Sequence, residues 1–174
     1  MFIAQSLDGF IARKDGGIDW LPAPETREDG TPEVFGYNEF MDGIDMLVMG
    51  RGSFEKVLSF GEWPYKKPVT VLTNKGVSIP ENLSQSVRSM SGDPADIVQK
   101  LAHQGFQHLY IDGGNTIQQF LRAGLIQKLI ISTMPVLIGS GLPLFGELPN
   151  DIKLQDITTT SFPNGIVQSE YEIQ

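Results

Sequence analysis

Two glycine-containing turns carry the residues with the clearest capacity for chemistry. In HLYIDGGNTIQQFLRAG (residues 108–124) an apolar strand runs into Gly113 and Gly114, and Asn115 or Thr116 opens a helix. Glycine has no Cβ atom, so a diphosphate can approach this backbone closely, and the helix N–H groups and dipole favour negative charge. The stretch therefore predicts a nucleotide-binding turn, although similar turns often serve as plain connections.

A second turn of this kind lies in DMLVMGRGSFEKVL, residues 45–58. Its apolar run ends at Gly50, Arg51 follows, and Gly52 and Ser53 lead into a short amphipathic helix. Ligands of open α/β sheets bind outside the carboxyl ends of the strands, so the two turns can converge on one cofactor. A guanidinium group at a helix start suits a phosphate, which makes Arg51 a predicted cofactor ligand, with a solvated surface arginine as the alternative.

The elements that must position these turns alternate along the chain as in an α/β domain. Apolar and β-branched runs predict strands. These runs are Phe2–Ala4, Met46–Met49, Val69–Thr73, His108–Ile111 and Leu129–Met134. Helices are predicted between them, and Asp93 and Pro94 suit the N-cap and first position of a helix over 95–103. Alternating residues on both sides of Pro163-Asn164-Gly165 predict a C-terminal antiparallel hairpin, so the sheet is mixed.

Length and composition fit a single domain over residues 1–174. Hydrophobic residues make up 40% and charged residues 20% of the chain, an ordinary globular composition. The absence of cysteine excludes disulfides, thiol nucleophiles and cysteine-bound metals, and neither histidine has partners at ligand spacing. We therefore expect no metal site.

The charge and apolar patterns also exclude some partners. The net charge is −8, and Lys66-Lys67 is the most basic stretch, so nucleic-acid binding is not expected. The sequence has neither an apolar run of about 18 residues nor a signal-peptide pattern. We expect a cytoplasmic protein that does not bind membranes.

Several motifs in a fixed order resemble the dihydrofolate reductase-like superfamily, especially stand-alone bacterial relatives of the reductase domain of bifunctional riboflavin-biosynthesis enzymes. They are FIAQSLDGFIA (2–12), VMGRGSFE (48–55), VLTNK (71–75), YIDGGNTIQQFL (110–121) and TMPVLIGSGLPLF (133–145). The resemblance implies a three-layer fold with helices on both faces of a mixed, mostly parallel sheet. It also implies NADPH as cofactor and a homodimer, whose interface the apolar stretch 135–148 could extend.

The cofactor contacts follow partly from charge and partly from the resemblance. A 2′-phosphate prefers Arg or Lys near the adenosine ribose, which favours Arg51 and Lys75, with Ser53, Thr73 and Asn74 as further donors. The resemblance places Ile11, Ala12 and Gly17 near the nicotinamide. The full predicted set is Ala4, Ile11, Ala12, Gly17, Gly50, Arg51, Gly52, Ser53, Thr73, Asn74, Lys75, Ile111, Gly113, Gly114, Asn115 and Thr116.

A loop rich in Gly, Pro and charge, Gly16–Thr31, is predicted to be mobile and to close over the site, because hydride transfer needs aligned rings and little water. Within it, Trp20 either contacts the substrate or packs beneath the surface. By resemblance, Gln5 and Ser6 lie near the substrate.

The acceptor chemistry is less well defined by the sequence. Dihydrofolate reductases carry a carboxylate on their first helix, and the matching position here is Val34, which argues against folate reduction. The candidate catalytic residues are Tyr37, Glu33 and Asp8; Tyr37 and Glu33 share a helical face. Asp112 either meets a ligand or orders the glycine turn through local hydrogen bonds.

The predicted function is reduction of a small planar heterocycle, pterin-like or ribosylaminopyrimidine-like, with hydride from NADPH. True dihydrofolate reductase activity is one alternative. A non-catalytic dinucleotide-binding or sensor protein is another, and turnover of NADPH separates it from an enzyme.

Overall fold

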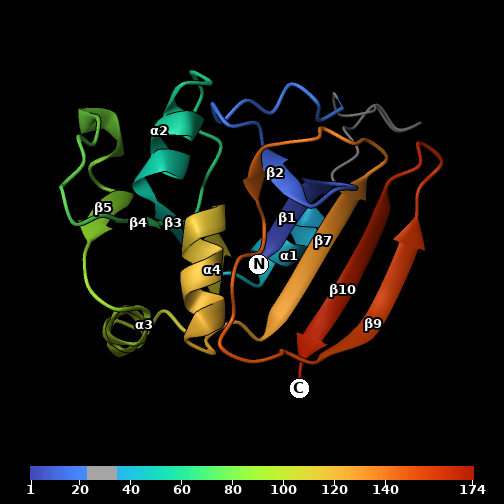
Figure 1. The fold of residues 1–174 in the computed structure, drawn as a ribbon. Coiled ribbons are helices and arrows are strands. Elements are labelled where there is room, and N and C mark those ends of the chain that lie inside the picture. Colours follow the sequence, from blue (N-terminus) through green and yellow to red (C-terminus); the bar gives the residue numbers. More distant parts are fainter. Residues whose placement is uncertain (23–34) are drawn as a thin grey trace.

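One sheet is built from four parallel strands at the centre of the chain. In the computed structural model, which describes residues 1–22 and 35–174 (Figure 1), the order is β5 (Val87–Met90), β4 (Val69–Leu72), β3 (Met46–Gly50) and β6 (Leu109–Asp112). All three ladders are parallel. The apolar run of β3 is buried on both faces, as expected of an inner parallel strand.

A second sheet joins the two ends of the chain. Its order is β1 (Phe2–Ser6), β7 (Lys128–Met134), β10 (Val167–Ile173) and β9 (Leu154–Ser161). β1 pairs with β7 in parallel, and the β9–β10 hairpin is antiparallel, which confirms the predicted C-terminal hairpin. A short ladder joins β2 (Phe10–Ala12) to β8 (Leu142–Pro143).

The two large sheets adjoin where β1 lies beside β6. No ladder joins these two strands among the described residues, and the Tyr110 hydroxyl donates to the carbonyl oxygen of Phe2 at 2.7 Å. The sequence predicted one mixed sheet. The observed architecture is mixed as predicted, with its hydrogen bonding interrupted at this junction.

Helices cover both faces, which confirms the predicted three-layer α/β fold. Along β3, Met46 and Val48 belong to one buried cluster while Leu47 and Met49 belong to another, so the two clusters lie on opposite faces. The first cluster includes side chains of α3 (Pro94–His103) and α4 (Gly114–Arg122). The second includes side chains of α1 (Tyr37–Asp42) and α2 (Arg51–Leu58).

Some element boundaries differ from the prediction. α4 begins at Gly114, with Gly113 as N-cap, rather than at Asn115 or Thr116. Asp93 occupies the predicted N-cap position of α3, but its side chain makes no capping hydrogen bond. Sequence patterns also missed β2, β5, β8 and the 3₁₀ helix Glu81–Leu83, because these elements are short and lack a clear apolar period. No helix in residues 1–22 or 35–174 is long and apolar enough to span a membrane.

Candidate active site

The two glycine turns lie side by side at the carboxyl ends of β3 and β6. These strands are parallel neighbours, and Met49 pairs with Asp112. Gly113 has φ +85°, and a Cβ atom there would collide with Ser53 Oγ. A Cβ atom on Gly50 would lie 3.0 Å from Thr116 Oγ1. The glycines therefore let the starts of α2 and α4 approach each other closely.

This pair of helix starts is suited to an anion. No side chain of the described structure caps α2 or α4, so their first-turn N–H groups remain available to a ligand. From β3 the chain continues outward to β4 and β5, and then returns to β6 on the other side of β3. The cradle thus occupies the point where the strand order reverses, the usual ligand site of open α/β sheets.

A cavity of about 980 Å³ extends from this cradle to both faces of the sheet. On the α3–α4 side its wall includes Leu72 and Ile97; on the α1–α2 side it includes Tyr37, Tyr65 and Tyr110. The predicted site residues that line it are Ala4, Ile11, Ala12, Tyr37, Gly50, Arg51, Gly52, Ser53, Thr73, Asn74, Gly113, Gly114, Asn115 and Thr116. The lining therefore comes from both sides of the sheet and from the glycine turns; we call the two sides of the cavity its arms.

Other predicted residues lie away from the cavity wall. Ile111 is buried in the core, and Lys75 is exposed on a turn in which its N–H donates to Thr73 Oγ1 at 3.2 Å. Gly17 lies within a loop whose neighbours Gly16 and Ile18 line the cavity. Glu33 and Val34 fall outside the described residues.

Asp8, a predicted catalytic residue, ties two loops together. Its carboxylate accepts hydrogen bonds from Ser6 Oγ at 2.6 Å and from the N–H groups of Ile138 and Gly139 at 3.2 and 2.7 Å. These bonds lower the pKa of Asp8, the bond from Ser6 most. Neither Asp8 nor the fully buried Ser6 lines the cavity, and their catalytic and substrate-binding roles stay predictions.

Gln5 and Trp20, the other predicted substrate contacts, also lie off the cavity wall. Gln5 Nε2 approaches Thr133 Oγ1 at 3.5 Å. Gln5 Oε1 and Trp20 Nε1 are buried and have no hydrogen-bond partner in the described part of the chain. Both residues are half-buried, and their contact with substrate stays a prediction.

The described part of the predicted covering loop has a defined geometry. Arg13 forms a two-pronged ion pair with Asp19, with Nε–Oδ1 and Nη2–Oδ2 distances of 2.7 and 2.8 Å. Between them, Gly17 N–H donates to Asp15 Oδ1 at 2.8 Å. Ile18, in the segment between the paired residues, lines the cavity.

The α1–α2 side of the cavity holds a carboxyl group among three tyrosines. Side chains alternate along β6, so Tyr110 and Asp112 share the face toward the second core cluster, where Tyr37 and Tyr65 also pack. Burial raises the pKa of Asp112. Burial, and then the nearby Asp112, also raise the pKa of Tyr37 to about 12 and those of Tyr65 and Tyr110 further.

Asp112 is thus suited to carry a proton. Burial is the largest influence on the pKa of Asp112 and raises it, whereas the Gly113 N–H, the N-terminal ammonium group and the Tyr110 side chain act in the opposite direction. Sequence patterns left the role of Asp112 open and missed Tyr65 and Tyr110. Strand alternation through Asp112 is the signal that could have found Tyr110.

Arg51 lies at the mouth of the cradle. Its guanidinium group lies 3.5 Å from Glu55, one helical turn along, and its side chain is 45% exposed. Within residues 1–22 and 35–174, no cluster of three or more His, Cys, Asp or Glu side chains could hold a metal ion.

The interrupted α/β sheet, the paired glycine turns at its strand reversal and the C-terminal hairpin together define a dihydrofolate reductase-like reductase fold. More specifically, the chain belongs to the RibD C-terminal domain family, which it matches over residues 1–168.

Individual relatives support this assignment. The chain is 33% identical to the Bacillus subtilis protein YwjB over 95% of its own length and 92% of that protein. A solved structure from Shewanella sp. PV-4 shares 40% identity, with a TM-score of 0.92 and coverage of 99% and 97% of the two chains. A Thermotoga maritima deaminase and 5-amino-6-(5-phosphoribosylamino)uracil reductase shares the fold at 16% identity and a TM-score of 0.74; the match covers 99% of this chain and 55% of that one.

Proposed function

We propose that this protein is an NADPH-dependent reductase of a small planar heterocycle, of the pterin or ribosylaminopyrimidine kind. The single observation that carries the proposal is the two-armed cavity whose arms meet at the paired glycine turns. Such a cavity can hold two flat rings face to face while a diphosphate rests on the helix starts. The family and the activity named for the Thermotoga maritima relative point to the same chemistry.

The residues of one arm fit NADPH. Uncapped N–H groups of α2 and α4 would hold the diphosphate, and Arg51 would contact a phosphate group. Thr73 and Asn74, which follow β4, line the arm on the α3 side and would bind the adenosine ribose. When bound, NADPH would supply the hydride.

The other arm would bind the acceptor and supply its proton. Tyr37 and Tyr65 offer ring faces and hydroxyl donors that stay protonated, because burial raises their pKa values. Reduction of a C=N or C=C bond adds one hydride and one proton, and Asp112 is the protein group best placed to give the proton. Ile18 and the Arg13–Asp19 pair would limit the entry of water.

The first test is a titration with NADPH and with NADH, followed by quenching of Trp20 and Trp63 fluorescence. We expect tight NADPH binding that weakens in Arg51→Ala. Oxidation of NADPH is then measured with pyrimidine and pterin acceptors, dihydrofolate included. Binding without oxidation by any acceptor would favour a sensor, and turnover confined to dihydrofolate would favour true dihydrofolate reductase activity. No binding of either dinucleotide at millimolar concentration would overturn the proposal.

A further inference from the structure

Two residues with positive φ stand directly before Tyr37, the first residue of α1. Phe35 has φ +50° and Gly36 has φ +79°. Glycine adopts such angles readily, but for a bulky side chain they are uncommon and persist only where contacts with the rest of the fold hold them. The contacts of Phe35 therefore help to determine where α1 begins and how Tyr37 enters the cavity wall.

The C-terminal hairpin supplies two of these contacts. Gln168 on β10 donates from Nε2 to the carbonyl oxygen of Phe35 at 3.0 Å and to Ser132 Oγ at 2.9 Å. The carbonyl of Phe35 can only accept, so the amide nitrogen of Gln168 must face it. The ring of Phe35 also packs edge-on against Phe162, with 4.7 Å between the ring centroids. Phe162 directly follows β9, so both contacts come from the hairpin.

Gln168 belongs to a row of residues that crosses the sheet toward the cavity. Ala4 pairs with Ser132, and Ser132 pairs with Gln168, so the three side chains lie on one face of the sheet. Phe2, two residues before Ala4 on β1, lies on the same face, and its ring centroid is 5.4 Å from that of Tyr37. Phe2, Ala4 and Tyr37 line the cavity, whereas Gln168 does not. Gln168 can therefore influence a bound ligand only through the residues that it holds.

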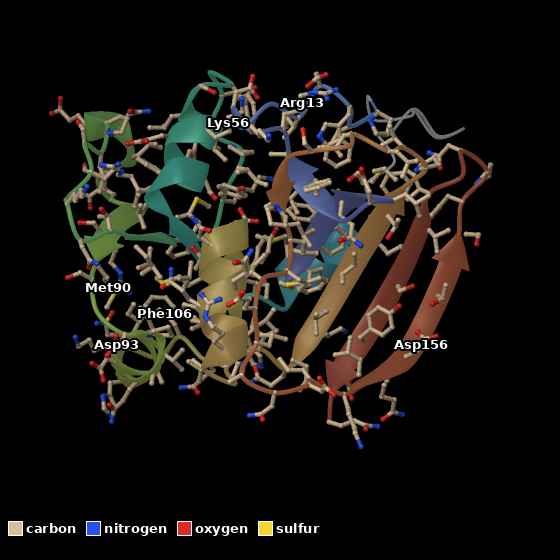
Figure 2. All side chains as sticks on the ribbon, viewed as in Figure 1. Arg13, Lys56, Met90, Asp93, Phe106 and Asp156 are labelled. Atoms are coloured by element: carbon tan, nitrogen blue, oxygen red, sulfur yellow. The ribbon has the colours of Figure 1, made fainter. Side chains whose placement is uncertain are left out.

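The opposite face of the hairpin provides a comparison. Ser169 Oγ lies 2.9 Å from Thr159 Oγ1 on that face, and Thr159 Oγ1 lies 3.2 Å from Asp156 Oδ1. Figure 2 shows Asp156 on β9, the outer strand of the hairpin. Removal of the Ser169 hydroxyl therefore takes a hydrogen bond from the same strand without altering the amide of Gln168.

We propose that Gln168 is a positioning residue for the α1–α2 arm of the cavity, the arm that would bind the acceptor. Its amide holds the backbone of Phe35 in the positive-φ conformation, and this fixes the start of α1 so that Tyr37 faces the bound acceptor. The inference rests on the proposed function and deepens it, because it gives the C-terminal hairpin a part in acceptor binding. Loss of the hydrogen bond should let the start of α1 shift and should move Tyr37 relative to the arm.

Fluorine NMR of protein labelled with 3-fluorotyrosine tests the position of Tyr37. The chain has four tyrosines, and the Tyr37 signal is identified by its loss in Tyr37→Phe. Gln168→Met keeps the approximate length of the side chain but removes both donated hydrogen bonds. We expect Gln168→Met to shift or split the Tyr37 signal, whereas Ser169→Ala should leave this signal where it is in the unaltered protein.

The functional consequence is measured by NADPH oxidation with the pyrimidine and pterin acceptors. Gln168→Met should lower kcat/KM for the acceptor about tenfold, as misplacement of a substrate-positioning group allows, and Ser169→Ala should not. The affinity for NADPH should be the same in both variants, because the cofactor is proposed to bind in the other arm. A fall in NADPH affinity that matches the fall in kcat/KM would overturn the inference, because the whole site would then have loosened.

The NMR experiment can also overturn the inference. An unchanged Tyr37 signal in folded Gln168→Met would do so, and so would an equal shift of this signal in Ser169→Ala. If Gln168→Met does not fold, Phe162→Leu takes its place, because it removes the other hairpin contact with Phe35, and an unchanged Tyr37 signal would again overturn the inference. Failure of the unaltered protein to bind NADPH would instead overturn the proposed function, whereas the NMR result would still report whether Gln168 positions Tyr37.

Discussion

Ser53 Oγ occupies the space that a Cβ atom on Gly113 would need. The serine lies in the first turn of α2 and the glycine is the N-cap of α4, so this contact fixes how closely the two helix starts approach. The distance between them determines whether both can contact one diphosphate.

We predict that Gly113→Ala destabilises the protein and abolishes NADPH binding. The positive φ alone costs about 1–3 kcal/mol, and the collision with Ser53 adds to it. Gly124→Ala is the matched control, because Gly124 has φ +66° and a Cβ atom added there would meet nothing within 4 Å. Urea unfolding should show a larger loss of stability for Gly113→Ala than for Gly124→Ala. A second change, Ser53→Ala, should restore part of the stability lost in Gly113→Ala. Equal losses at the two glycines would contradict the collision.

For Asp112→Asn we expect greater stability at neutral pH. The pKa of Asp112 is raised above 3.8, so from pH 3.8 to the raised value the folded protein binds more protons than the unfolded chain. The free energy of unfolding therefore falls as pH rises through this interval, and the asparagine variant escapes that loss. Urea unfolding between pH 4 and 8 measures this difference in the free energy of unfolding. The exposed Asp96→Asn variant serves as the control. A variant less stable than the parent at pH 7 would mean that the carboxylate is well compensated.

Asp8→Asn should behave in the opposite way. The pKa of Asp8 is lowered, chiefly by the Ser6 hydrogen bond, so its contribution to stability is present above pH 3.8 and is lost as pH falls through the lowered value. The variant should unfold at a lower urea concentration than the parent at pH 7, and this difference between the two proteins should disappear in acid. Because Asp8 lies off the cavity wall, NADPH affinity should change little.

Arg51→Ala should weaken NADPH binding about tenfold, because a charge-assisted bond to phosphate is lost. Lys75→Ala provides the comparison: both were predicted cofactor ligands, but Lys75 lies off the cavity wall, so its removal should have little effect. Fluorescence titration of both variants with NADPH shows which residue contributes more to cofactor binding. A stronger effect at Lys75 would place the 2′-phosphate on the turn after β4.

A homodimer remains a prediction, and the stretch 135–148 is its expected surface. Leu137 is 68% exposed there. Leu137→Asp should shift sedimentation equilibrium toward monomer, whereas Leu154→Asp on the edge strand β9 should not. Dissociation by the β9 variant alone would locate the interface at the hairpin instead.

Much of the fold could be predicted from the sequence, because strong local signals coincide with its main elements. The apolar run of β3, the Asn-Gly turn of the hairpin and the glycine pair each follow from short-range chemistry. The proximity of Asp112 to Tyr37 and Tyr65 could not be predicted from local patterns, because these residues meet only through tertiary packing. The hydrogen-bond partners of Asp8 could not be predicted for the same reason, because Ile138 and Gly139 lie 130 and 131 residues away.

The cavity is space that the side chains of the two core clusters leave unfilled. A ligand that binds there and not to the unfolded chain raises the melting temperature according to its concentration and affinity. Thermal-shift screening can therefore identify the natural acceptor without an assumed reaction. Compounds that shift the melting temperature only when NADP⁺ is present would be those that share the cavity with the cofactor.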